Sequence, residues 1–380
     1  MILKAKLILL LITLATGLSA QKKNQVVYVP MSSDKWEYNP AKVRFITHKG
    51  QKAVRIDTLK GEDRQQLTAK NILFTNGTIE FDVEITVPPF LGISFREQGN
   101  EKEHVYLRVG RAGKATAGDA VQYTPIIKGV NLWNVYPNYQ SAADIRSYEW
   151  NHVKLVVSGM QMRVFVNGKL ALSVHKLEGN SLTGGVSIEG PGIYANMVIR
   201  HNEVENLDPN AGVDPTAYDL RYIRKWKVSP PVALPYKQEL NNLDVPKTEE
   251  GWTVIKAEYR GLVNLVRVHG PGKERRAAWL KVNIKSEKDQ VRKIDIGFSS
   301  EVWVFMNGQM VYIDKNYYSS PIRKQPDGRC SIENGSFYLP LRKGENELVV
   351  GLADDLSGYG GSAFGWGAIL RFDRVEELEF

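Results

Sequence analysis

The sequence predicts an all-β protein that consists of two β-sandwich domains of the jelly-roll type, joined by a proline-rich linker. Three observations lead to this fold class. Short β-favouring runs are separated by Gly, Asn and Pro, and no amphipathic helix of about ten residues lies between them. Each half of the chain contains an Asn-Gly dipeptide between apolar runs, at Asn167-Gly168 and Asn307-Gly308. Prolines gather between these two dipeptides.

The Asn-Gly dipeptides predict two hairpins of the same design. Both central residues of a type I′ turn need positive φ angles, which Asn and Gly tolerate best. In the second hairpin we expect Phe305 opposite Met310 and Trp303 opposite Tyr312, all on one apolar face. Both faces of this hairpin are apolar, so one packs in the core while the aromatic one meets a loop or the first domain. A sugar-stacking surface is the alternative for the aromatic face.

The first domain is predicted at 26–205, as an antiparallel sandwich. The expected strands are short and regularly spaced, which excludes a parallel α/β sheet. They lie at 53–56, 78–87, 92–96, 105–109, 152–157, 162–166 and 186–189.

The composition changes after the first domain, where prolines interrupt the chain from Pro209 to Pro246. Proline removes a backbone donor and pre-sets turns, so we predict a linker at 206–217 and a second domain at 218–380. The strands expected in the second domain lie at 252–257, 277–284, 292–298, 302–313, 347–352 and 367–372.

The N-terminus predicts export. Lys4 and Lys6 precede an apolar run at 7–14 and then small residues up to Ala20, which is the order of a secretory signal peptide at 1–20. The apolar run is too short to span a bilayer, and no other run is long enough, so no membrane span is expected. We therefore expect an exported protein that is periplasmic, secreted or held at the cell surface.

Cysteine content and charge restrict the fold and the partners. Cys330 is the only cysteine, so the fold depends on its hydrophobic cores rather than on an intrachain disulfide. The predicted signal peptide holds two of the basic residues and no acidic one, which lowers the formal net charge of +8 to +6. These charges alternate along the chain and form no basic stripe, so we expect no nucleic-acid partner. The oligomeric state is left open.

Several motifs carry a resemblance to known families. The first domain resembles the concanavalin A-like lectin/glucanase jelly roll in its laminin-G-like, sugar-hydrolase-like branch, through GTIEFDVEI at Gly77, GISFRE at Gly92, WNHVKLVV at Trp150, VFVNGK at Val164 and GGVSIEGPG at Gly184. The second domain resembles the galactose-binding-like jelly roll through IGFSSEVWVFMNGQMVY, LPLRKGENELVVGL and FGWGAILRF. Both resemblances imply an exported protein that is concerned with carbohydrate.

An acidic row in the first domain is the candidate catalytic motif. Strand alternation places Glu80, Asp82 and Glu84 on one face, and alternate residues are close enough for the two carboxyl groups of a retaining glycosidase. The resemblance implies that laminarinase-type members use such a row as nucleophile, acid/base and modulator. The alternative is the solvated acidic face of an outer strand.

The segment 96–148 is the candidate binding region, and we interpret it as a long functional loop centred on 121–139. Sugars present flat C–H faces bordered by hydroxyl groups, so their sites combine aromatic rings with planar amide and guanidinium groups. The candidate carbohydrate-binding residues are Arg96, Tyr106, Arg108, Gln122, Tyr123, Trp133 and Tyr136. The alternative for the aromatic residues is a satellite core beneath the loop.

Other cofactors have little support. The six histidines are scattered without the spacing of metal ligands, so no catalytic metal and no other cofactor is expected. Calcium stays open, because Asp and backbone oxygens of sandwich loops bind it, although no EF-hand loop occurs.

The resulting hypothesis is an exported carbohydrate-binding protein whose partner is an extracellular poly- or oligosaccharide. The first alternative is a glycoside hydrolase that uses carboxylates of the first domain, and the second is a structural adhesion or assembly protein. Binding without catalysis is preferred.

Overall fold

A computed structural model describes residues 25–57, 66–86, 90–318, 320–354 and 364–380. The chain is all-β, and α1 (Leu265–His269) is the single α-helix in these ranges. Short 3₁₀ turns occur at η1 (Ser33–Lys35), η2 (Val109–Arg111) and η3 (Tyr259–Gly261). The predicted fold class of two β-sandwiches is confirmed, whereas the predicted signal peptide lies outside the described residues.

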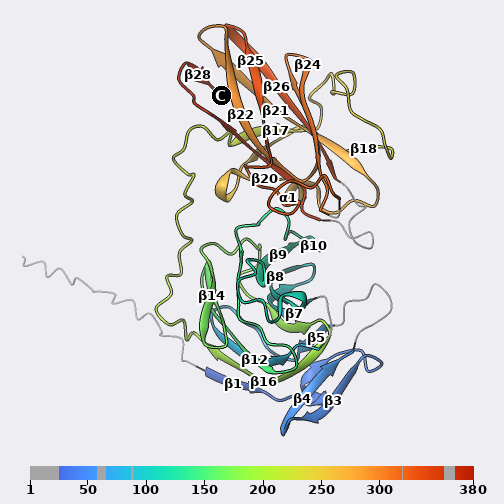
Figure 1. Ribbon diagram of the computed structural model, residues 1–380, viewed down its shortest axis with the longest axis vertical. Helices are drawn as coiled ribbons and strands as arrows, with labels where there is room; N and C mark the ends of the chain where they lie inside the picture. Colours follow the sequence, from blue (N-terminus) through green and yellow to red (C-terminus); the bar gives the residue numbers. More distant parts are fainter. Residues whose placement is uncertain (1–24, 58–65, 87–89, 319, 355–363) are drawn as a thin grey trace, which may run out of the picture.

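The N-terminal sandwich consists of two antiparallel sheets (Figure 1). Sheet A has the order β14-β13-β12-β6-β16-β4-β3, with β1 beside β16. Its strands are β1 (Gln25–Val29), β3 (Val43–His48), β4 (Gln51–Ile56), β6 (Gly77–Glu84), β12 (Trp150–Ser158), β13 (Gln161–Val166), β14 (Lys169–Val174) and β16 (Gly192–His201). Sheet B has the order β10-β9-β8-β7-β15-β5-β2, with β11 beside β9. Its strands are β2 (Trp36–Glu37), β5 (Gln66–Ala69), β7 (Phe90–Gln98), β8 (Glu101–Arg108), β9 (Val121–Ile127), β10 (Val130–Asn131), β11 (Gln140–Ser141) and β15 (Gly185–Glu189).

The C-terminal sandwich also consists of two sheets. The larger has the order β19-β17-β21-β26-β23-β24, with β18 and β28 beside β21, and the smaller has the order β20-β27-β22-β25. The strands of the larger sheet are β17 (Lys225–Val228), β18 (Val232–Ala233), β19 (Thr253–Lys256), β21 (Arg276–Ser286), β23 (Ser300–Met306), β24 (Gln309–Asn316), β26 (Gly344–Asp354) and β28 (Leu378–Glu379). The strands of the smaller sheet are β20 (Val263–Asn264), β22 (Gln290–Phe298), β25 (Gly335–Leu341) and β27 (Gly367–Phe372).

Period-two alternation explains how each sheet finds its core face. In β6, Ile79, Phe81 and Val83 are buried in the core, while Glu80 and Asp82 lie on the other face and are partly exposed. One continuous cluster of buried apolar residues extends through both sandwiches. Burial of apolar surface therefore holds the two halves together as well as each sandwich.

The second Asn-Gly hairpin forms as predicted, with one change of register. Asn307 has φ 49° and Gly308 has φ 77°, as a type I′ turn requires. Phe305 lies opposite Met310 as expected, but Trp303 lies opposite Ile313 rather than Tyr312. The predicted pairing of Trp303 was wrong because a bulge follows Val304 and shifts the register.

The aromatic face of this hairpin was predicted to meet either a loop or the first domain, and it packs against a loop. Trp303 and Phe305 form a separate cluster with Trp279, Leu234 and Leu240. Trp303 Nε1 also donates to the Glu239 carboxylate at 2.9 Å. The loop that carries Leu234 and Leu240 therefore covers the rings.

The segment 202–224 connects the sandwiches and contains no strand (Figure 1). The carbonyl of Pro209 accepts a hydrogen bond from the Met160 amide at 2.8 Å, and Gly212 N–H donates to the His175 carbonyl at 2.7 Å. Gly159 lies so close that an added Cβ would meet the Pro209 oxygen at 2.0 Å. The segment that contains the predicted linker thus packs along the N-terminal sandwich, and the predicted boundaries stay predictions.

The described ranges contain only short helices, of three to five residues each. None of their helices combines the length and the apolar character that crossing a bilayer requires.

We predict that Gly308→Ala lowers the free energy of unfolding by about 1 kcal/mol, because an L-residue disfavours the positive φ of the turn. No atom lies within 4 Å of the added Cβ, so steric crowding does not contribute. Gly110→Ala is the matched control, since its Cβ also enters open space but its φ is not positive. Chemical denaturation checks this; equal losses for both variants would contradict it.

Candidate functional site

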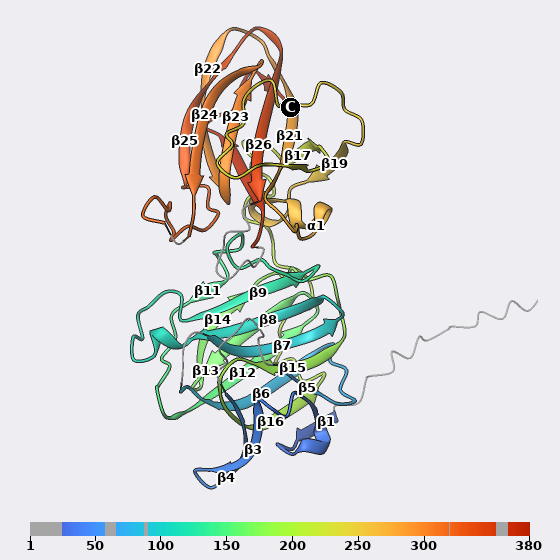
Figure 2. The ribbon, with the colours of Figure 1, turned by 90° about the vertical axis from the view of Figure 1, so that its right-hand side faces the viewer.

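The outward face of sheet B carries a continuous set of polar side chains, called here the polar face. It is formed by the outward residues of five strands, β5, β7, β8, β9 and β15, and Figure 2 shows β7, β8 and β9 side by side. Along β8 the inward residues Val105 and Leu107 enter the core, while His104, Tyr106 and Arg108 alternate with them. The face is largely buried, so its polar groups depend on one another for hydrogen bonds.

One end of the polar face combines aromatic, guanidinium and amide groups. The Tyr106 hydroxyl donates to Gln122 Oε1 at 2.9 Å, and Arg108 donates both to Gln122 and, at 3.2 Å, to the Tyr106 oxygen. The Arg108 guanidinium lies 5.3 Å from the centre of the Phe90 ring and 5.2 Å from that of Tyr106. Gln122 Nε2 donates to the Trp133 carbonyl at 3.0 Å. The sequence-predicted residues Tyr106, Arg108, Gln122 and Trp133 therefore do meet.

The other end of the polar face is built around a buried carboxylate, Glu189. It accepts from Ser94 Oγ at 2.9 Å, lies 2.9 Å from His104 Nδ1 and lies 3.4 Å from Lys102 Nζ. Burial disfavours its charge, but His104, Lys102 and Ser94 outweigh this and hold the pKa of Glu189 well below its usual range. His104 Nδ1 faces both Ser94 and Glu189, so its two ring nitrogens do not link a nucleophile to a carboxylate.

Two of the predicted binding residues point away from the polar face. Arg96 has φ 53° beside a bulge in β7, and its guanidinium donates to the carbonyls of Thr75 and Gly159. Tyr123 faces the core and donates to Glu103 at 2.7 Å. Both side chains are buried at sites where they tie loops or strands together.

The two remaining predicted rings lie where the sandwiches meet. Trp133 is 7% exposed and is covered by Tyr318 and Phe364, whose ring centres lie 4.7 and 5.5 Å away. Tyr136 is 2% exposed and donates to Glu258, while Asn264 donates to its hydroxyl at 3.1 Å. Neither ring forms an open platform. Glycan binding by the set predicted from the sequence stays a prediction.

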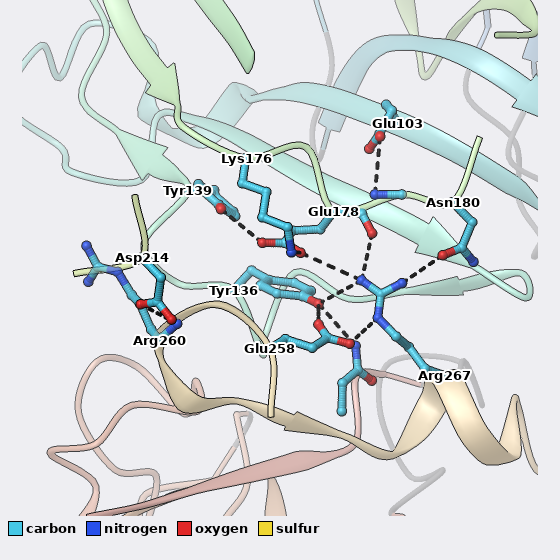
Figure 3. Close-up of polar contacts among 12 residues, drawn as sticks. Glu103, Tyr136, Tyr139, Lys176, Glu178, Asn180, Asp214, Glu258, Arg260 and Arg267 are labelled. Atoms are coloured by element: carbon cyan, nitrogen blue, oxygen red, sulfur yellow. Dashed lines mark hydrogen bonds and ion pairs between the residues drawn. The ribbon is translucent and has the colours of Figure 1, made fainter. Parts of the chain in front are cut away.

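A polar network fixes this junction of the sandwiches (Figure 3). Arg267 of α1 donates to the Glu178 carbonyl at 2.7 Å, to Asn180 at 2.8 Å and to Glu258. Burial raises the pKa of Glu103 to about 7, and its carboxylate accepts the amide of Gly179, next to Glu178, at 3.2 Å. The network thus connects α1 to the interior of the N-terminal sandwich.

The predicted acidic row lies on the opposite sheet from the polar face. Alternation does place Glu80, Asp82 and Glu84 on the outer face of β6, as expected. Each carboxylate has partners there, drawn from neighbouring strands and turns. Glu80 pairs with Arg200 at 3.3 Å and His152 at 3.6 Å; Asp82 with His152 at 2.8 Å and Asn196 at 2.7 Å; Glu84 with His48 at 3.0 Å and Lys49 at 2.7 Å.

These partners outweigh the desolvation of Asp82 and Glu84 and lower the pKa of each carboxyl group. The row therefore forms an ion-paired ladder. Its catalytic assignment stays an untested prediction.

Sequence reasoning missed part of the site and misread its local structure. The sequence predicts a loop at 121–127, where Pro125 interrupts the strand pattern. The structure instead has strand β9 in this region. Pro125 is tolerated because it lies between the positions at which β10 and β11 pair with the outer edge of β9. Arg267 at the junction has no local sequence signal, because its partners come from parts of the chain that are distant in sequence.

Within the described ranges, His, Cys, Asp and Glu side chains form no group of three or more that could hold a metal ion.

No protein-family model and no curated protein matches the chain. Solved structures with similarity include the carbohydrate-binding module CBM66 from Bacillus subtilis (11% identity, TM-score 0.31, covering 44% of this chain and 92% of that one). A β-glucanase from Bacillus licheniformis (12%, 0.34, 47% and 98%) and the galectin LEC-6 from Caenorhabditis elegans (12%, 0.27, 43% and 99%) are further examples. These low values do not assign the chain to a family.

The junction predicts a pH dependence of stability through His269. Burial, with Arg276 and Lys128 nearby, lowers the pKa of His269 from 6.5 to about 4. A histidine whose pKa is lowered by folding contributes its full stabilisation of the folded state above the unfolded pKa. This contribution is lost as the pH falls from 6.5 to about 4. As the pH falls over this range, we expect the free energy of unfolding of His269→Phe to rise relative to that of the parent by on the order of 2 kcal/mol.

Denaturation of parent and variant across the range checks this expectation. His175→Phe, at an exposed histidine, is the control and should follow the parent. A parent-to-variant difference for His269→Phe that does not change with pH would contradict the prediction.

Proposed function

We propose that the chain is an exported carbohydrate-binding protein whose glycan contacts the polar face of sheet B. One observation carries this proposal: Phe90, Tyr106, Arg108 and Gln122 meet on adjacent strands, as rings beside planar donors and acceptors. A pyranose ring offers C–H groups to an aromatic face and hydroxyl groups at its edge. The amide and guanidinium groups match these hydroxyl groups with directional hydrogen bonds.

Phe90 is the point at which a sugar meets this group. Phe90 is 37% exposed as a residue, whereas Tyr106 is 6% exposed. The two rings lie edge to face with centres 5.3 Å apart, and Arg108 packs against both. A rigid ring that is already held by its neighbours loses little conformational entropy when a ligand packs on it.

Export is part of the proposal and is supported by the order of charged, apolar and small residues at 1–20. An extracytoplasmic location would bring the polar face to poly- or oligosaccharides outside the cell. The expected partner is therefore a glycan rather than a nucleic acid.

Binding is tested by affinity electrophoresis and calorimetry against neutral and acidic glycans. For a glycan bound by the parent, we expect Phe90→Ala to weaken binding about ten-fold, through lost ring contact. Tyr338→Ala is the control, because Tyr338 is 70% exposed on β25 of the C-terminal sandwich. Equal affinity of the parent and Phe90→Ala for that glycan would remove this site, and a parent that binds no glycan would overturn the proposal.

Binding without hydrolysis is expected, because the acidic row is engaged in ion pairs on the other sheet. We predict no release of reducing ends from glycans that the parent binds. Glu80→Gln, Asp82→Asn and Glu84→Gln serve as matched variants. If the parent releases reducing ends and any of these substitutions abolishes the release, the hydrolase alternative is established instead.

A further inference from the structure

Two arginines from different sandwiches lie close to the Trp133 ring. The Arg108 guanidinium from β8 lies 5.9 Å from the ring centre, and the Arg329 guanidinium from the C-terminal sandwich lies 5.2 Å from it. Arg108 is 7% exposed and Arg329 is 1% exposed. Two like charges are therefore held at one buried ring, where water screens them poorly.

Acidic side chains do not balance these charges. Asp119 lies 3.4 Å from Arg108 Nε and 3.8 Å from Arg329 Nη2, but it is bound more closely by Arg111, at 2.7 and 3.0 Å. Asp327 lies 3.7 Å from Arg329 Nη1, and its side chain is 50% exposed. Three guanidinium groups thus share one partly buried carboxylate, and positive charge is in excess.

Several donors of the two arginines also lack acceptors. Nε of Arg108, and Nε and Nη1 of Arg329, are buried without a hydrogen-bond acceptor in the part of the chain that the structure describes. A buried donor without an acceptor costs folding free energy, and more so when the group is charged. Burial and repulsion from Arg108 accordingly lower the pKa of Arg329.

We infer that Arg108, Arg329 and Trp133 form a subsite for an anionic group on the glycan, a uronic acid carboxylate or a sulfate ester. This inference rests on the proposed function and narrows its ligand to acidic glycans. Guanidinium forks bind such oxygen groups with paired hydrogen bonds, which would supply the missing acceptors and the missing negative charge. The Arg108 guanidinium also contacts the exposed Phe90 ring, which joins the subsite to the sugar contact.

The subsite requires both sandwiches. Arg108 and Trp133 belong to the N-terminal sandwich, and Arg329 is placed by the C-terminal one, where Asn316 and Asn334 donate to its backbone carbonyl. The backbone amide of the next residue, Cys330, donates to the Asn134 carbonyl at 2.8 Å. This bond fixes Arg329 beside the residue that follows Trp133. The second sandwich therefore completes the anion subsite.

Full-length parent and Arg329→Gln are compared on three polymers with galactose-type backbones: polygalacturonate, carrageenan and neutral galactan. Polygalacturonate carries carboxylates, carrageenan carries sulfates and galactan carries neither. We expect the parent to prefer one acidic polymer, with binding that weakens as salt rises. We expect Arg329→Gln to lower that affinity about ten-fold or more.

The matched control is Arg323→Gln, which removes a nearby positive charge at a side chain that is 46% exposed and pairs with Asp327. It should bind the acidic polymer as the parent does. Arg329→Lys keeps the charge but not the fork, and it should also bind more weakly than the parent. In thermal unfolding, added galacturonate or galactose sulfate should raise the melting temperature of the parent more than that of Arg329→Gln. This separates lost binding from lost folding.

The outcomes separate this inference from the proposed function. Equal affinity of the parent and Arg329→Gln for the acidic polymer overturns the subsite. Binding of neutral glycans alone, sensitive to Phe90→Ala, overturns it as well but leaves the proposed function intact. Absence of binding to any glycan overturns both.

Discussion

The contact between the two sandwiches is the constraint on which the rest of the structure depends. The side-chain amide of Asn134 donates to the Gly365 carbonyl at 2.9 Å and accepts the Gly365 amide at 2.8 Å, much as a neighbouring strand would. Trp133, next to it, is covered by rings of the C-terminal half. Because the apolar core continues across this contact, the sandwiches do not meet as independent modules. Their contact also buries Trp133 at one end of the polar face.

This contact has an energetic consequence for the polar side chains around it. Glu178 is buried and Arg267 is partly buried, and such charged groups are stable only when partners replace the hydration that they lose. At Arg267 the replacement is complete, with carbonyl, amide and carboxylate acceptors. At Arg329 it is not, although both arginines cross the same junction. The two arginines at one junction therefore differ in how completely protein groups replace their hydration.

The sequence predicts local features well and spatial neighbours poorly. Alternation and the Asn-Gly turns suffice to predict two sandwiches, because both signals arise within a few residues of chain. The side of the sheet on which a side chain lies is harder to predict. The bulge beside Arg96 moves its side chain to the other side of the sheet, and no residue type in the sequence predicts this bulge. The meeting of Trp133 with Arg329 depends on folding the whole chain. Composition therefore identified some residues in 96–148 that lie together, but not the burial of Trp133 and Tyr136 against the second half.

The same limit applies to the acidic row and the polar face, which differ in their balance of carboxylates and cations. Strand alternation shows that three carboxylates share a face, but it does not show what lies on the adjacent strands. In β12, His152 pairs in register with Asp82, and β16 brings Arg200 next to the row, so carboxylates and cations are matched. On the polar face the balance is reversed near Trp133, where guanidinium donors outnumber carboxylate acceptors. A matched ladder is complete without a ligand, whereas an excess of buried donors favours an anionic one.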